Sequence, residues 1–154
     1  MYICDVRKIR KLQKNLYVLR RMVGWTAEDL ASQLGVSRQT VSAIEKNEGV
    51  EMTRLQYIAI RAIFDYEIKE NQNDALANAI ELMVDREDIS DAQQKEIDNE
   101  VDKIMKSTNR KAGNAAILAG MTALCSTAGP IGIIVGGLAA KKMKEKNGSN
   151  AKKK

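Results

Sequence analysis

The stretch of sequence that decides the fold is residues 25–45, which read WTAEDLASQLGVSRQTVSAIE. Thr26 followed three residues later by Asp29 is an acidic variant of the capping box, which predicts the start of a helix. Gly35 predicts the end of that helix, because glycine takes the left-handed backbone conformation without a steric penalty. Ser37 predicts the start of a further helix just beyond the turn. The stretch therefore predicts two short helices joined by a tight turn.

The helix after the turn has an apolar side and a polar side. Val41 and Ile44 recur at helical spacing and are expected to face inward, and Val36 is expected to fill the core beneath the turn. The side chains that remain on the outer face, near the start of the helix, are Arg38, Gln39, Ser42 and Ala43. An α-helix that presents polar side chains in this way fits the major groove of DNA.

This part of the chain resembles the lambda-repressor-like helix-turn-helix family of xenobiotic-response-element (XRE) type, over residues 15–65. The resemblance is carried by LGVSRQTVS at 34–42, by Leu19-Arg20-Arg21 and by Ile44-Glu45. It implies a compact domain of five helices in which residues 37–46 are the recognition helix.

The resemblance also implies which side chains contact DNA. It places Arg38 and Gln39 at base edges, and it pairs Arg20 with Glu45 as an ion pair that joins the first helix to the recognition helix. The DNA-binding set implied in this way is Ser37, Arg38, Gln39, Thr40, Ser42, Lys46 and Asn47.

Some positions depart from the family pattern. Ala27 stands where family members usually carry a phosphate-binding Gln, and Ala43 stands at a position that often contacts a base. Glu48 and Glu51 follow the recognition helix and would repel nearby phosphates, which predicts a weaker affinity for DNA.

Charge is strongly segregated along the 154 residues, although the net charge is only +5. Residues 1–64 carry 11 basic and 6 acidic side chains, residues 65–102 carry 3 and 13, and residues 103–154 carry 11 and 1. This pattern predicts a basic DNA-binding part, an acidic connector that faces away from DNA, and a basic tail. Lys11, Lys14 and Arg21 are further candidates for phosphate contact, although a basic helix face is usually only a solvated one.

The residue content argues against an enzyme. The chain has no histidine, which excludes a histidine general base and a histidine metal ligand. Its two cysteines, Cys4 and Cys125, have no metal or redox spacing and are expected to be small buried hydrophobic residues. We therefore expect no catalytic residues, no metal, no cofactor and no small-molecule ligand. The charged N-terminus predicts no secretion signal, and hence a cytoplasmic protein.

The apolar spacing predicts an all-α protein throughout. A first helix is expected from about Asp5 to Val23, and a helix opened by Thr53 is expected to turn Leu55, Ile58, Ala59, Ala62 and Ile63 inward. A capping box at Ser90 predicts a helix whose apolar stripe is Ile97, Val101, Ile104, Met105 and Thr108. The expected organisation is a helix-turn-helix domain at 1–65, an acidic helical connector at 66–111, a Gly/Ala-rich helical hairpin at 112–146 and a basic disordered tail at 147–154.

The segment 112–140 has no charged residue, and it contains Pro130 beside Gly129. Small residues recur at every fourth position on both sides of this proline, which predicts a hairpin with arms at about 112–125 and 131–146. Two alternatives remain open from the sequence. The hairpin is embedded at the inner face of the cell membrane, with its lysines at anionic headgroups, or it is buried within the protein or a dimer.

These features predict a sequence-specific transcription regulator, a repressor, that binds double-stranded DNA as a homodimer. The dimer contact is expected in the C-terminal half, along the Ile97–Met105 stripe and its continuation through Ala116 and Gly120, because residues 1–66 show no second apolar surface. The alternative function is a membrane-associated interaction or effector protein in which 112–140 is the working part.

Overall fold

The computed structural model describes residues 5–47, 49–108 and 113–127, and each element in these ranges is helical. The elements are α1 (Val6–Met22), α2 (Ala27–Leu34), α3 (Arg38–Lys46), α4 (Arg54–Asn71), α5 (Asp74–Ile80), the π-helical turn η1 (Glu81–Asp85), α6 (Asp91–Ser107) and α7 (Gly113–Thr127). The predicted all-α fold is confirmed. Four helices begin before residue 65, and the fifth, α5, follows at Asp74.

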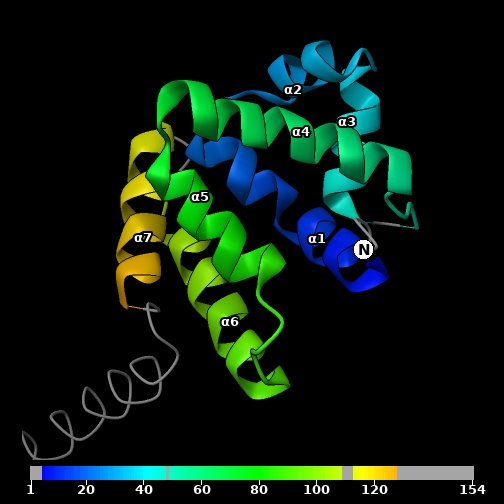
Figure 1. Cartoon of the computed structure of the whole chain (residues 1–154). Coiled ribbons are helices and arrows are strands. Elements are labelled where there is room, and N and C mark those ends of the chain that lie inside the picture. Colours follow the sequence, from blue (N-terminus) through cyan, green and yellow to red (C-terminus); the bar gives the residue numbers. More distant parts are fainter. Residues whose placement is uncertain (1–4, 48, 109–112, 128–154) are drawn as a thin grey trace, which may run out of the picture.

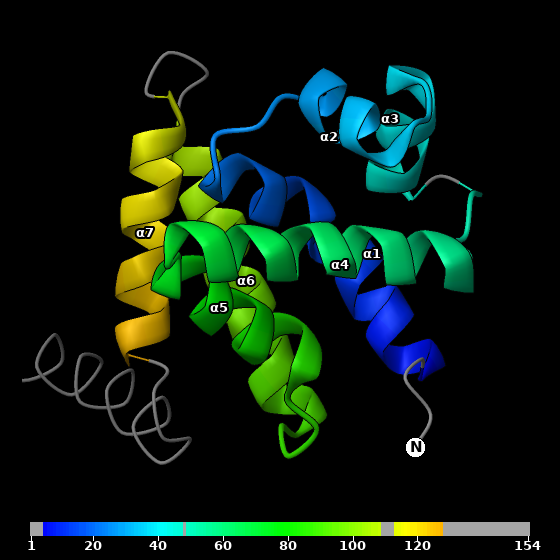
Figure 2. The ribbon, with the colours of Figure 1, turned by 45° about the horizontal axis from the view of Figure 1, so that its top comes forward.

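Helix α1 lies at the centre of the molecule. Helices α2 and α3 pack on one side of it, α4 crosses it, and α5, α6 and α7 gather on the other side (Figures 1 and 2). The apolar side chains Ile9, Leu12, Leu16 and Leu19, spaced by three and four residues, are buried, whereas Val6 is half exposed at the first turn. Val18 and Met22 are buried as well, so α1 is covered on more than one side. A helix surrounded in this way holds both ends of the molecule together.

The predicted helix starts are present. Thr26 and Asp29 form a reciprocal capping box at α2, and Ser90 forms one with Gln93 at α6. Gly35 has a φ of 67° at the end of α2, the left-handed conformation expected of a glycine in this turn. These features depend on neighbouring residues only, which is why the sequence alone predicts them.

The expectation for Val36 is wrong. Its side chain is 40% exposed, while its backbone N–H donates to the carbonyl oxygen of Ala31 at 3.0 Å. The turn is closed by this backbone hydrogen bond. The core between α2 and α3 is filled instead by Leu30, Val41 and Ile44, each at most 1% exposed.

The predicted inner face of α4 is wrong for Leu55, Ile58 and Ala62, whereas Ile63 packs partly against the core as expected. Leu55 is 76% exposed and Ile58 is 46% exposed, whereas Tyr57, Ile60 and Phe64 are buried. Both stripes have helical spacing, so periodicity cannot choose between them. The structure buries the stripe that carries two aromatic rings, because these rings remove more apolar surface from water.

One hydrophobic core runs through both halves of the molecule. Ile80 and Val84 belong to the same cluster as Leu16 and Leu19 of α1. The boundary expected after residue 65 lies inside α4, which continues to Asn71. The acidic connector and the helix-turn-helix are therefore packed against each other over a shared core.

The π-helical turn η1 follows α5 directly. The backbone N–H of Arg86, the residue after η1, donates to the carbonyl oxygen of Glu81, five residues earlier, at 3.0 Å. The wider turn places three consecutive apolar side chains, Leu82, Met83 and Val84, inside the core. An ordinary α-helical turn would direct one of them toward solvent.

The expected dimer stripe on α6 is used within the chain. Ile97 and Val101 are buried, and Ile104 and Met105 pack partly against the core. A Cβ atom on Gly120 of α7 would lie 2.7 Å from Cγ2 of Ile104, so glycine allows α7 to approach α6 closely. The chain's own α7 covers this stripe, which removes the basis for placing a dimer contact there.

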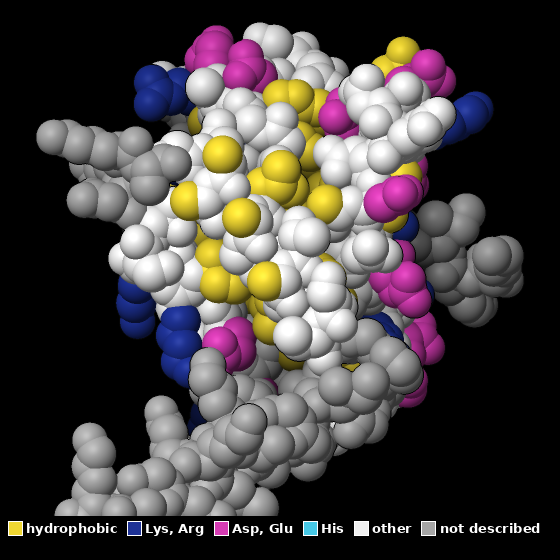
Figure 3. Space-filling model, turned by 90° about the vertical axis from the view of Figure 1, so that its left-hand side faces the viewer, with side chains coloured by type: hydrophobic (Ala, Val, Ile, Leu, Met, Phe, Trp, Pro, Cys, Tyr) yellow, Lys and Arg dark blue, Asp and Glu magenta, His cyan; other side chains and the backbone are white. Residues whose placement is uncertain are grey.

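Helix α7 corresponds to the first arm of the expected hairpin. Ile117 and Met121 are buried, and the outer face is built of Ala, Thr and Ser side chains without a charge (Figure 3). The second arm at 131–146 and the tail at 147–154 lie outside the described residues. None of the described helices is long and apolar enough to cross a membrane.

Candidate nucleic-acid interface

The recognition helix expected at 37–46 is α3, which begins at Arg38 with Ser37 as its N-cap. Ser37 Oγ accepts a hydrogen bond from the Thr40 backbone N–H at 3.2 Å and lies 3.0 Å from Thr40 Oγ1. Asn47 ends the helix in the left-handed conformation, with a φ of 53°. Ser37, Thr40 and Asn47 therefore define the two ends of α3.

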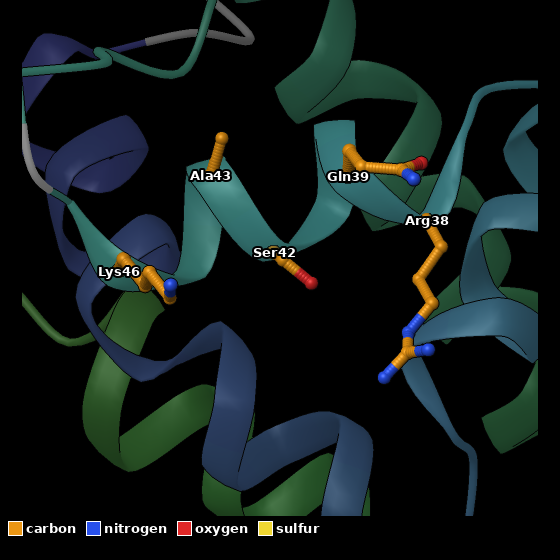
Figure 4. Close-up of a pocket in the computed structure, with 5 residues that line it drawn as sticks. All are labelled: Arg38, Gln39, Ser42, Ala43 and Lys46. Carbon is orange, nitrogen blue, oxygen red and sulfur yellow. The ribbon is translucent and has the colours of Figure 1, made fainter.

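The outer face of α3 presents polar and cationic side chains along the length of the helix. A shallow depression there is lined by Arg38, Gln39, Ser42, Ala43 and Lys46 (Figure 4). Arg38 and Lys46 are eight residues apart, so their Cα atoms are separated by about 12 Å along the helix axis. Gln39 and Ser42 add hydrogen-bonding groups between them. This is a cationic and polar surface of the dimensions of a groove contact.

The inner side of α3 is held to α1 by an ion pair between Arg20 and Glu45. Arg20 Nε and Nη2 donate to the two carboxylate oxygens of Glu45 at 2.6 and 3.0 Å. Arg20 Nη1 also donates to the carbonyl oxygen of Trp25 at 2.6 Å. The side chains are only 5% and 9% exposed, so this bidentate pair is shielded from solvent and fixes the direction of α3.

A second support, Gln13, was missed by the sequence analysis. Its Nε2 donates to the carbonyl oxygens of Ile44 at 3.1 Å and Val50 at 2.6 Å. Its Oε1 accepts from the backbone N–H of Met52 at 2.9 Å. The side chain is 3% exposed, and it ties the end of α3 to the loop that follows. One signal in the sequence could have identified it: Gln13 lies four residues after Ile9 and therefore on the same, buried face of the helix.

The lysines of α1 that were candidates for phosphate contact bind groups of the protein. Lys11 Nζ donates to the carbonyl oxygen of Arg86 at 2.8 Å, and Lys14 forms an ion pair with Asp98. Lys8 pairs with Glu87 at 3.0 Å, and this contact raises the pKa of the lysine. The acidic connector therefore neutralises part of the basic first block within the chain.

Arg21 lies closer to the recognition helix and contacts α7. Its Nε donates to Asn114 Oδ1 at 2.6 Å, and its Nη1 donates to Tyr17 Oη at 2.9 Å. The start of α7 thus reaches a second depression that also borders α3. The side chains and glycine that line it are Tyr17, Arg20, Arg21, Trp25, Thr26, Ala27, Arg38, Ser42, Glu45, Lys46, Gly113 and Asn114. No signal in the sequence connects positions so far apart.

The structure shows the contacts of two acidic side chains near the interface, Asp29 and Glu51. The backbone N–H of Thr26, and then its hydroxyl group, donate to Asp29 and hold the pKa of this carboxyl below its usual value. Glu51 is exposed and lies 4.0 Å from Arg10. Glu48 lies outside the described residues. Asp29 therefore stays charged at the start of α2, where it also interacts favourably with the helix dipole.

Metal binding and thiol chemistry are two other kinds of chemistry to examine in the described part of the chain. No group of three or more His, Cys, Asp or Glu side chains there could hold a metal ion. Cys125 is half-buried on α7, and this burial raises the pKa of its thiol to about 11. Cys4 lies outside the described residues.

Comparison with known proteins identifies the segment that carries this interface. Residues 16–59, from the middle of α1 into α4, match the family model described as helix-turn-helix. No curated protein and no solved structure gives a match to the chain. Residues 16–59 are therefore a helix-turn-helix of the lambda-repressor-like XRE type, the architecture of DNA-binding transcription regulators, which confirms the resemblance found in the sequence.

Proposed function

We propose that this protein is a sequence-specific transcriptional repressor that binds double-stranded DNA as a homodimer, with α3 in the major groove. The observation that carries the proposal is the contrast between the two sides of α3. The outer side presents Arg38, Gln39, Ser42 and Lys46, whereas the inner side is fixed by the buried Arg20–Glu45 pair. A rigidly held helix with a polar outer face is suited to contact base edges at fixed positions.

The chemistry of the outer side chains assigns their roles. The guanidinium group of Arg38 can donate two parallel hydrogen bonds to guanine, and the amide of Gln39 can pair with adenine. Ser37, Thr40, Ser42, Lys46 and Asn47 supply hydroxyl, ammonium and amide groups for phosphates or neighbouring bases. A repressor needs no more than this, because occupancy of an operator by a tightly bound protein excludes other proteins from it.

The test is selection of binding sites from a randomised double-stranded oligonucleotide library with the full-length chain. The selected duplex is then used to measure the affinities of Arg38→Ala and Gln39→Ala. We expect each change to cost about 1–3 kcal/mol on the selected duplex and to relax base preference at one position. Lys95→Ala and Asn99→Ala, at exposed positions of α6, are the matched controls. Equal losses on the selected duplex and on random DNA would assign Arg38 and Gln39 to phosphate contact only.

A second candidate function is a membrane-associated interaction or effector protein, and the composition of α7 favours it. No residue from Gly113 to Thr127 is charged, and the uncharged run continues in sequence to residue 140, before a cluster of lysines. Such a segment suits an interfacial position with its lysines at anionic headgroups. Co-sedimentation of the full chain with vesicles of phosphatidylglycerol and phosphatidylcholine tests this candidate. Failure to sediment at low ionic strength would exclude it.

A further inference from the structure

Helix α4 carries an apolar stripe that no described element covers. Leu55 is 76% exposed, Ile58 is 46% exposed and Tyr66 is 66% exposed, and Ala62 between them is exposed as well. Figure 2 shows α4 running across the front of the molecule, with the described helices beside and behind it. Large exposed apolar side chains that lie together on a protein surface mark an interaction site.

The stripe is a continuous face of the helix. Leu55, Ile58, Ala62 and Tyr66 follow one another at steps of three and four residues, which places them on one side of α4. The opposite side, with Tyr57, Ile60 and Phe64, is the side that packs into the core. The exposed stripe is therefore available for a partner while the fold is complete.

We propose that this stripe is the dimer interface, and that a second copy of the chain occupies it by packing its own α4 in antiparallel orientation. The inference deepens the proposed function, since it names the surface through which the regulator would dimerise. In a two-fold symmetric contact the same patch is used by both copies, so the patch must be complementary to itself.

The α4 stripe meets this requirement for a two-fold axis at the level of residue 60. Ile58 then lies opposite Ala62 of the second copy, and Tyr66 of the second copy lies one residue from the position opposite Leu55, so that large side chains meet smaller or flat ones. At the edge of the stripe, Asp65 of the second copy lies one residue from the position opposite Arg54. Asp65 Oδ1 already accepts from Arg61 Nε at 2.9 Å, and because the side chain is 53% exposed, its carboxylate can accept this second contact.

The charges at the edges of the stripe favour a second copy over a membrane surface. An interfacial helix carries lysines and arginines along its polar flanks. Here the C-terminal end of the stripe is bordered by Asp65 and Glu70 together with Lys69, whereas Arg54 stands at the N-terminal end. Such opposite ends attract each other in an antiparallel pair and would partly repel anionic headgroups.

The test is sedimentation equilibrium of the full-length chain without DNA. We expect the wild-type chain to form dimers at micromolar concentration and Leu55→Glu to weaken dimerisation at least tenfold. Thr122→Glu is the matched control, because Thr122 is exposed on α7, a different helix, and its replacement should leave dimerisation unchanged. Circular dichroism checks that each variant remains helical. A monomeric wild type, an unaffected Leu55→Glu variant, or an equal loss in Thr122→Glu would overturn the proposal.

A charge exchange tests the antiparallel orientation. Arg54→Asp alone and Asp65→Arg alone should each weaken the dimer, and the double variant should restore it, because each copy then supplies the reversed pair. Absence of restoration would overturn the orientation. Arg38→Ala separates this inference from the proposed function: it should lose affinity for the selected duplex and remain dimeric. Full affinity in that variant would count against the DNA-binding role of Arg38 and leave the dimer result intact.

Discussion

The recognition helix α3 and helix α7 are joined to α1 by different kinds of contact. On the first side, the buried Arg20–Glu45 pair and the amide of Gln13 fix α3 through hydrogen bonds of defined direction. On the other side, α7 is attached mainly by apolar side chains such as Ile117 and Met121, with Arg21–Asn114 as a polar contact at its start.

This difference relates to what each region has to do. Hydrogen bonds and bidentate ion pairs are directional, so they specify the angle at which α3 leaves the molecule. Apolar packing is non-directional and contributes stability in proportion to the surface removed from water. The recognition helix is therefore positioned by polar contacts, and the fold as a whole is stabilised by the core that α5, η1, α6 and α7 complete.

The largest effect is expected from Glu45→Ala in the full-length chain. Removal of the carboxylate leaves the guanidinium group of Arg20 buried without an anionic partner, in contact with the carbonyl oxygen of Trp25 and the ring of Tyr17. Breaking a buried pair in this way typically costs about 3–5 kcal/mol of unfolding free energy. Urea denaturation followed by circular dichroism measures the loss, with Glu28→Ala on the exposed side of α2 as the control. A loss no greater than that of the control would show that the pair does not stabilise α3.

Met121→Ala tests the other side of the comparison. Met121 is fully buried, so truncation should cost about 2–5 kcal/mol. The loss should appear in a single cooperative transition, because α7 shares its core with α1. Thr122→Ala, at the exposed neighbouring position, should change stability little. A separate early transition of α7, with the helix-turn-helix unaffected, would show that the two regions unfold independently.

The reactivity of the Cys125 thiol measures how closely α7 packs against the rest of the protein. Because burial raises the pKa of its thiol to about 11, the thiolate fraction at pH 8 should be about a hundredfold lower than in an unfolded chain. The folded state retains this proton, so the associated stability is present below the ordinary pKa of 9.0 and is lost as the pH rises toward 11. A Cys4→Ser chain leaves one thiol for measurement with an aromatic disulfide reagent. Reaction as fast in the native chain as in urea would contradict the burial.

The smallest effect is expected from Lys14→Met, which removes the ion pair with Asp98. The lysine side chain is 56% exposed, so the pair is screened by water and should contribute less than about 1 kcal/mol. The effect should disappear in 1 M sodium chloride. Lys95→Met, at an exposed position of α6, controls for the change in net charge. A larger loss that persists in salt would mean that the contact is less accessible to solvent than its exposure indicates.

Local signals predicted much of the fold. The capping residues Thr26, Ser37 and Ser90 and the left-handed Gly35 depend only on residues within one or two turns, and the structure has all of them. The inner face of α4 could not be predicted because two apolar stripes compete on one helix. Packing against residues distant in the sequence decides which stripe is buried; one of them is Trp25, whose ring stacks on Phe64 with centroids 5.9 Å apart.

The sequence also predicted part of the candidate interface and missed the rest. Motif positions identified the outer side chains of α3 and the pairing of Arg20 with Glu45, although their contacts with DNA stay predictions. Gln13 was missed because its three backbone partners lie at least 31 residues away. The contact of Arg21 with Asn114 spans 93 residues, and no helical period or charge pattern relates such positions.

The contact between Arg21 and Asn114 couples the binding of DNA to the docking of α7 on α1. The guanidinium group of Arg21 is held beside the recognition helix by a side chain at the start of α7, so the direction of this cation depends on whether α7 is docked. A partner or surface that draws α7 away from α1 would change the electrostatic potential along one edge of the DNA-facing surface. By reciprocity, DNA that binds more tightly to one of these two arrangements shifts the docking of α7 by the same free energy.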